Sequence, residues 1–185
     1  LPVMHNPTLG NVGLLMRLWS VVLAGNLIGT AVAAWAFNYM PIFDEPTRQA
    51  FVSIAEDVMK NSPTEMFANA IISGWLVATM VWMFPVAGAA KIVVIILMTW
   101  LIALADTTHI VVGSVEILYL VFNGNLPWSD FIWPFALPTL AGNICGGTFI
   151  FALLSHAQIR NDMSSKRKAE ARAQAAEKGK KADRA

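Results

Sequence analysis

The sequence predicts an all-α membrane protein built from an inverted repeat of helices, with discontinuous helices inside the repeat. Three observations indicate this fold. The chain of 185 residues is 56% hydrophobic and only 14% charged, whereas a soluble domain carries about 25% charged residues. Several apolar stretches have the length of membrane spans, and one of them is interrupted by polar residues. A water-soluble domain is therefore excluded.

The charged residues are unevenly distributed along the chain. Nine of the 13 Lys and Arg lie in residues 160–185, which carry a net charge of +5, while the first 159 residues carry −4. Short cytoplasmic flanks of membrane proteins are rich in Lys and Arg, so this charged tail is predicted to be cytoplasmic. It is expected to form a solvated helix that contacts anionic lipid headgroups. Its cations are not interleaved with aromatic residues, so no nucleic-acid partner is expected.

The first repeat is expected to end within residues 1–40, which hold a half-helix and a span at Leu18–Met40. A connection follows at residues 41–62, where acidic residues outnumber basic ones, so it is placed on the outer, periplasmic side. Within the connection Pro46 opens a short helix whose apolar residues recur at helical spacing. This helix is predicted to lie along the outer surface.

The second repeat is predicted to occupy residues 63–159. It opens with a span at Pro63–Phe84 and closes with a span at Phe131–Ala157, each close to or above the roughly 20 residues that a membrane crossing needs. Pro134 and Pro138 are expected to kink the closing span near its start.

The region between these spans, Lys91–Phe122, is too long for one straight helix. Its 32 residues would form a rod of about 48 Å, against a hydrocarbon core of about 30 Å. Four polar residues, Asp106 to His109, separate its two apolar halves. Asp and Thr are good N-cap residues, so Asp106, Thr107 or Thr108 is expected to begin a second half-helix. Two half-helices are therefore predicted to meet near the membrane midplane.

An internal repeat supports this organisation. Shifting the chain by 117 positions pairs Leu23-Ala24-Gly25-Asn26 with Leu140-Ala141-Gly142-Asn143, and Gly29 with Gly146. In the same register Leu1–Pro7 matches the end of the broken helix. The chain, which begins with Leu1, is therefore expected to be truncated at its N-terminus within an earlier repeat. A unit of span, broken helix and span crosses the membrane an odd number of times, so consecutive units are inverted, as in transporters.

The break between the two half-helices also predicts a site for anions and for proton exchange. It directs the N-terminus of the second half-helix, with its free N–H groups and partial positive charge, at the membrane centre, which favours anions. His109 lies at this point and changes protonation near neutral pH. Ile102 and Val77 are expected to supply an apolar surround, where a bare anion is costly. A weak acid would avoid that cost by accepting a proton and crossing neutral.

Each candidate has an alternative interpretation. His109 could simply hydrogen-bond the ends of the broken helix. Thr107 and Thr108 could be helix caps, solute ligands or both. Glu116 lies on the same helical face as His109 and could relay protons or make a buried contact between subunits. Lys60 could draw anions to the pore mouth or be an ordinary membrane-surface lysine.

The sequence gives no reason to expect a cofactor, a metal or an enzyme. The single cysteine, Cys145, fits no disulfide framework or cysteine-based metal site and is expected to be a packing residue. No phosphate-binding glycine loop is evident, nor is any pairing of a nucleophile with a base.

These residues resemble the formate/nitrite transporter family. The resemblance rests on the run at residues 24–30, on Trp75-Leu76-Val77 followed by Val81-Trp82-Met83, on the broken helix with His109, and on the run at residues 141–147. It covers residues 1 to about 160 and the last four of the family's six spans. It is strongest to a poorly characterised bacterial inner-membrane branch with a charged C-terminal tail.

The resemblance implies an aquaporin-like protomer, a homopentamer with one pore per subunit, and passage of small monovalent anions such as formate, nitrite or hydrosulfide. By the match, His109 takes the place of the central pore histidine and Lys60 approximately that of the vestibule lysine. Val77 and Ile102 take the places of constriction residues. Thr107 and Thr108 replace an aromatic and acidic pair, and Gly74 and Gly113 each replace an asparagine. A neutral-solute channel and a non-transporting scaffold are therefore the alternatives.

Overall fold

The computed structural model describes residues 8–152, and all regular secondary structure in this range is helical. The first seven residues and residues 153–185 lie outside the described range. The predictions for the Leu1–Pro7 half-helix, for the end of the last span and for the basic tail fall there.

The first long helix, α2, runs from Leu9 to Tyr39 and begins nine residues earlier than the predicted span. Thr8 caps its N-terminus, accepting a hydrogen bond from the Asn11 backbone N–H at 3.2 Å. Glycines and the polar residues Asn11 and Arg17 interrupt the apolar pattern before Leu18. Helical backbone continues through them because its hydrogen bonds do not depend on side-chain polarity.

The predicted surface helix is α3, Glu45–Met59. Asp44 caps it, and Pro46 lies in its first turn, where a missing N–H costs nothing. The side chain of Ala55 is fully buried against α6, with Val52 and Val58 packed around it. Ile54 remains half exposed, so α3 shows one face to the protein and one to its surroundings.

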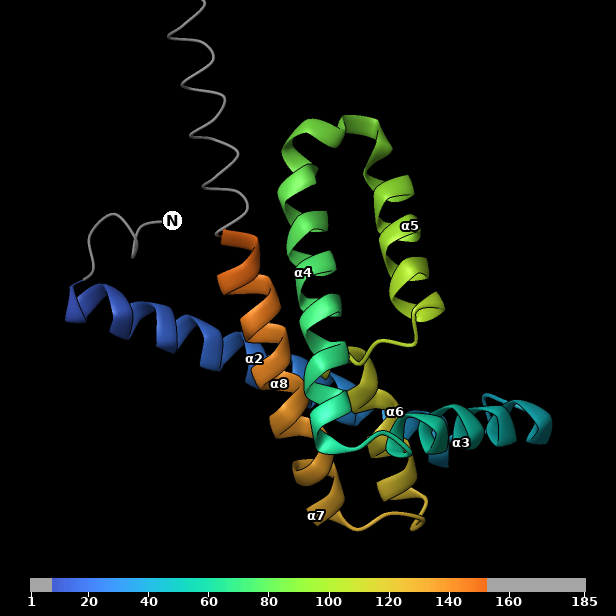
Figure 1. Ribbon diagram of the computed structural model, residues 1–185. Coiled ribbons are helices and arrows are strands. Elements are labelled where there is room, and N and C mark those ends of the chain that lie inside the picture. Colours follow the sequence, from blue (N-terminus) through green and yellow to red (C-terminus); the bar gives the residue numbers. More distant parts are fainter. Residues whose placement is uncertain (1–7, 153–185) are drawn as a thin grey trace, which may run out of the picture.

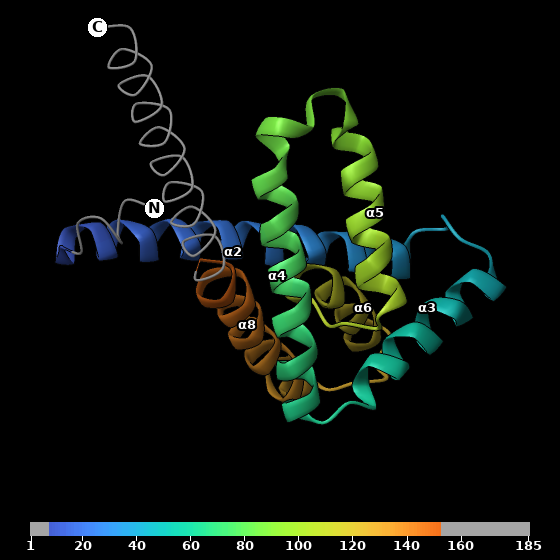
Figure 2. The ribbon, with the colours of Figure 1, turned by 45° about the horizontal axis from the view of Figure 1, so that its top comes forward.

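The next two helices form a hairpin. Helix α4 spans Pro63–Ala87, a 3-10 turn follows at Gly88–Ala90, and α5 spans Lys91–Leu104. Pro85 lies inside the last turn of α4, so this helix continues three residues beyond the predicted span, which ended at Phe84. Figures 1 and 2 show α4 and α5 antiparallel, with α2 running crosswise to them.

Helix α6, Ile110–Phe122, lies beyond the break and is the centre of packing. It contacts α2, α3 and α8, and eight of its 13 residues are buried. Both apolar clusters of buried residues include α6: Ile117 belongs to one and Leu118 to the other.

The chain then returns beside α4 through several helical pieces: α7 (Trp128–Asp130), the π-helical η2 (Phe131–Ala136), α8 (Leu137–Ile144) and the π-helical η3 (Cys145–Ile150). The kink predicted from the two prolines occurs at one of them. Trp133, which precedes Pro134, has extended backbone angles (φ −138°, ψ 122°), as proline favours in its predecessor. Pro138 lies in the first turn of α8 without a kink, because its missing N–H is tolerated there.

Large apolar side chains cover the outside of these helices. Val86 is 84% exposed and Ile92 69%, and no residue of α5 is buried. Two helical stretches within the described residues are long and apolar enough to cross a membrane, Leu9–Tyr39 and the α4–α5 hairpin at Pro63–Leu104. An apolar surface of this extent requires a partner or lipid rather than water.

Candidate functional site

The candidate site is the break between α5 and α6. The C-terminal end of α5 is closed by Thr107, whose backbone N–H and side-chain hydroxyl both donate to the Ile102 carbonyl, at 3.2 and 3.0 Å. Asp106 turns the chain with φ of 49°, in the left-handed region that Asp tolerates better than most residues. The apolar region therefore forms two helices that meet at a tight, hydrogen-bonded turn.

The predicted cap of the second half-helix is wrong. His109, rather than Asp106, Thr107 or Thr108, is the N-cap of α6, and its Nδ1 accepts a hydrogen bond from the Val111 N–H at 3.3 Å. Both threonine hydroxyls donate to carbonyl groups instead. His109 thus makes the helix-end hydrogen bond that was one of its alternative interpretations, while its Nε2 is not used by that bond.

Three polar side chains, of which Ser73 and Thr108 are buried and Asn143 is half-buried, hold the residues on both sides of His109. The hydroxyl of Thr108 donates to the Met66 carbonyl at 2.8 Å, and the hydroxyl of Ser73 donates to the Thr108 carbonyl at 2.5 Å. Asn143 accepts from the Ile110 N–H at 2.9 Å. We refer to Ser73, Thr108 and Asn143 as the break clamp.

Asn143 connects the members of this clamp. Its amide nitrogen donates to the Ala70 carbonyl at 2.8 Å and to the Ser73 hydroxyl at 3.0 Å, while its amide oxygen holds α6. One side chain on α8 therefore joins α4 to the start of α6. Sequence reasoning placed Asn143 in the repeated motif but assigned it no role, and it missed Ser73 entirely.

Glycines bring α8 close enough for the clamp to form. A Cβ atom at Gly142 would lie 2.3 Å from the Phe67 carbonyl oxygen, and one at Gly74 would lie 2.5 Å from the Asn143 carbonyl oxygen. At Gly146 a Cβ would overlap the Ile71 carbonyl oxygen. Helix backbones that touch in this way require small residues at the contact.

Gly74 and Gly113, the two positions where the resemblance expects asparagine, have no room for a side chain. The Asn143 backbone occupies the place of any side chain at Gly74, and the Phe135 ring lies where a Cβ at Gly113 would be, 2.7 Å from its Cζ. The break is steadied by Ser73 and Asn143, so the loss of these two side chains does not leave the turn without support.

The structure places four of the six predicted pathway residues, Ile102, Thr107, Thr108 and His109, at the turn or hydrogen-bonded to it. Ile102, His109 and Val77 are half-buried, the first two on either side of the turn and the third one helical turn beyond Ser73 on the same face of α4. The break contacts the stretch of α4 from Met66 to Ser73, in the first half of that helix.

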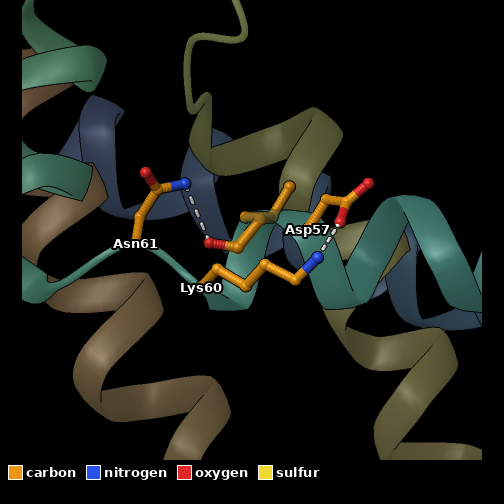
Figure 3. Close-up of polar contacts among 4 residues, drawn as sticks. Asp57, Lys60 and Asn61 are labelled. Atoms are coloured by element: carbon orange, nitrogen blue, oxygen red, sulfur yellow. Dashed lines mark hydrogen bonds and ion pairs between the residues drawn. The ribbon is translucent and has the colours of Figure 1, made fainter.

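Lys60 lies apart from the break, at the end of α3. Its ammonium group forms an ion pair with Asp57 at 2.5 Å (Figure 3), and both side chains are mostly exposed. The hydrogen bond and the attraction from Asp57 raise the pKa of Lys60, so the ammonium remains charged but partnered. Asn61 beside it donates to the Val58 carbonyl.

Glu116 lines a different space. A pocket of about 430 Å³ lies between α2, α3 and α6, and its walls are apolar except for this carboxylate. Phe37, Phe51 and Tyr119 form part of its lining, while His109 does not. The pocket therefore does not join Glu116 to His109. Within residues 8–152, no group of His, Cys, Asp and Glu side chains could hold a metal ion.

Comparisons with known proteins give a single family. The family model described as formate/nitrite transporter matches residues 2–157. The chain is 83% identical over 175 residues to the inner membrane protein YfdC of Escherichia coli (strain K12), a match that covers 95% of this chain and 56% of that protein. The chain thus spans about half the length of this curated relative. No solved structure matches the chain.

Proposed function

The chain belongs to the formate/nitrite transporter family, and from that premise we propose that it forms part of a transmembrane pathway for small monovalent anions such as formate, nitrite or hydrosulfide. It is a multi-pass helical protein of the inner membrane and not an enzyme. The observation that carries the proposal is the interrupted helix, held by the polar side chains of the break clamp, with His109 at its turn.

Backbone that is not helical is tolerated at membrane depth only where protein or a water-lined cavity satisfies it. The break clamp provides that satisfaction on the side of α4 and α8. The clamp engages neither ionisable side chain of the turn, exposed Asp106 or half-buried His109. Ionisable groups inside membranes are usually functional, and of the two only His109 changes protonation near neutral pH. In this proposal the solute meets the imidazole between the apolar side chains of Ile102 and Val77. Thr107 and Thr108 shape the turn, since both hydroxyls already donate to carbonyls.

The other wall of the pathway is assigned to a preceding repeat of the inverted pair. Gly142 on α8 and Gly146 on η3 are packed against the backbone of α4. Their partners in the repeat, Gly25 and Gly29 on α2, would have nothing within 4 Å of an added Cβ. A helix equivalent to α4 would fit that open face. The family's fold is aquaporin-like, and two such repeats around one pore would complete it here.

The remaining assignments follow from the family and from charge. We propose a homopentamer with one pore per subunit and a cytoplasmic C-terminal tail, since the basic residues gather there. Lys60 would lie at the outer mouth and raise the local concentration of anions. Its ion pair with Asp57 reduces this effect relative to a free lysine.

Flux of candidate anions into liposomes tests the proposal. The complete protein is reconstituted and the flux of formate, nitrite and hydrosulfide is measured across a pH series, with His109→Asn as the variant and His156→Asn as a matched histidine control. The proposal expects flux in the wild type and a pH dependence that His109→Asn abolishes and His156→Asn leaves intact. Absence of flux for all three anions would contradict it and favour the non-transporting scaffold.

A neutral-solute channel is the second candidate, and the cap geometry favours it. Because Nδ1 of His109 accepts a hydrogen bond, the imidazole in this structure is suited to the neutral state. In this candidate the solute crosses uncharged and His109 contributes only hydrogen bonding. Flux that is insensitive to both pH and membrane potential would distinguish it from anion passage.

A further inference from the structure

The first turn of α6 has unusual hydrogen-bond partners. The leading N–H groups of a helix have no partner within the helix and need acceptors from elsewhere. Asn143 accepts from the Ile110 N–H at 2.9 Å, and Nδ1 of His109 accepts from the Val111 N–H at 3.3 Å. The backbone carbonyl of His109 then accepts from Gly113 and begins the regular helix. One of the two ring nitrogens of His109 is therefore committed to the cap.

The hydrogen bond accepted by Nδ1 determines which ring nitrogen of His109 carries the proton. A neutral imidazole has one acceptor nitrogen and one N–H donor, whereas a protonated ring has two donors and no acceptor. With Nδ1 accepting, the neutral ring carries its proton on Nε2. A proton added to Nδ1 would point at the Val111 N–H and would also face the positive end of the helix dipole. The capped helix and the protonated histidine therefore exclude each other.

We propose that His109 acts on the solute as a neutral hydrogen-bond donor through Nε2–H, and that it takes up a second proton only when the first turn of α6 loses its cap. The inference rests on the proposed function in placing His109 on the solute route. The solute it selects has a lone pair to accept the bond, as a small oxyanion, a sulfide or the corresponding neutral acid does.

The break clamp determines what moves when the cap is lost. Thr108 is held through its hydroxyl and its carbonyl, and Ile110 is held through its N–H, so the backbone on both sides of His109 is fixed to α4 and α8. Release of the cap is therefore a rotation of the His109 side chain rather than a shift of the turn. Proton uptake and reorientation of the imidazole occur as one event.

The ionisable groups around the ring are few. The other ionisable side chains on its own segment are Asp106 in the turn, and Glu116 and Tyr119 on α6. Among the described residues, the helices that contact the break carry only three more, Glu65 in the first turn of α4, Lys91 at the far end of α5 and Cys145 after α8. The side chains that contact the turn from α4 and α8, Ser73 and Asn143, have no charge.

Nitrogen-15 NMR of the complete protein in lipid bilayers, labelled at histidine, tests the tautomer directly. The difference between the spectra of the wild type and His109→Asn isolates the two ring nitrogens of His109. At neutral pH the inference expects a bare, hydrogen-bonded Nδ1 and a protonated Nε2. A ring with its proton on Nδ1, or a doubly protonated ring with the cap intact, would overturn it.

Hydrogen exchange at the first turn of α6 tests the coupling to pH. After correction for intrinsic rates, exchange in the wild type should rise about fivefold as His109 is protonated, the factor that corresponds to one capping bond. Asn caps helices well and does not titrate, so His109→Asn should exchange slowly at every pH. His109→Ala has no cap and should exchange fast at every pH.

These measurements separate the two proposals. Wild-type exchange that is independent of pH, together with flux whose pH dependence requires His109, would overturn the coupling and leave the proposed function standing. Absence of flux would overturn the proposed function and the donor role with it, whatever the state of the cap.

Discussion

The two copies of the repeated motif differ in what surrounds them. The copy at residues 140–146, on α8 and the start of η3, packs against α4: its glycines touch the backbone of α4, and Asn143 makes three hydrogen bonds that link α4 to α6. On α2 the copy at residues 23–29 is open, with Asn26 exposed and no atom within 4 Å of a Cβ at either glycine. The motif provides a small-residue surface on which another helix can pack closely. Hydrogen bonds form at that surface only where such a helix is present, as α4 is at residues 140–146.

The largest expected effect is the loss of the glycine contact on α8. Gly146→Ala adds a Cβ that would overlap the Ile71 carbonyl oxygen, so α8 and α4 must separate. Because the overlap is with backbone, which cannot move aside as a side chain can, we expect a net cost above about 3 kcal/mol; the helix-propensity gain of about 1 kcal/mol from replacing glycine offsets only part of the overpacking. The yield of folded protein after membrane extraction, measured by size-exclusion chromatography, should fall sharply.

A glycine-to-alanine substitution on α2 tests whether the two copies of the motif make equivalent helix contacts in the complete protein. In the complete protein Gly29→Ala should be as damaging as Gly146→Ala if a helix like α4 packs on the open face. Gly13→Ala, on the same helix with nothing within 4 Å, is the control and should be neutral or slightly stabilising. A Gly29→Ala variant that behaves like Gly13→Ala would contradict the proposed packing of a preceding repeat on α2.

The second effect in size concerns the asparagines. Asn143→Ala leaves the buried Ile110 N–H without its acceptor and removes the link between α4 and α6, which we expect to cost about 3 kcal/mol. Asn26→Ala is the matched variant on α2. Thermal unfolding of the detergent-solubilised 185-residue chain should show a clear loss for the first and little change for the second. Equal losses of thermal stability would contradict the structure, because they would mean that Asn26 is also engaged in packing contacts.

The sequence was sufficient for features that depend on chain length and periodicity. The apolar region at Lys91–Phe122 exceeds the membrane thickness, which predicts two helices whatever packs around them, and Phe51 and Val58 at helical spacing predict α3. The cap of α6 could not be predicted in this way. Propensity favours Asp and Thr there, but Ser73 and Met66 bond to Thr108 from α4 and leave the cap to His109. Such contacts depend on residues more than 30 positions apart.

A third, smaller loss of stability distinguishes a hydrogen bond between two helices from a hydrogen bond within one helix. The Thr108 hydroxyl, 4% exposed, donates across to α4, whereas the Thr79 hydroxyl donates to the Trp75 carbonyl of its own helix. Thr108→Val should cost about 1 to 2 kcal/mol because the clamp loses a buried bond. Thr79→Val, the matched control, should change stability by no more than a few tenths of that amount. Similar losses in thermal unfolding would show that the clamp is not what holds the turn.

The smallest effect lies in the connection between the two copies, residues 41–62. The Thr47 hydroxyl, and then the Thr47 backbone N–H, hold the pKa of Asp44 below its ordinary value of 3.8. A carboxylate with a lowered pKa stabilises the folded state above its unfolded pKa, and this contribution is lost as the pH falls through the folded pKa. Hydrogen exchange in the first turn of α3 should therefore accelerate only below about pH 4, slightly in the wild type and not in Asp44→Asn, which caps without titrating. Acceleration that extends to α8 would mean that α3 couples the two copies, and the contrast between them would then depend on the connection as well as on α4.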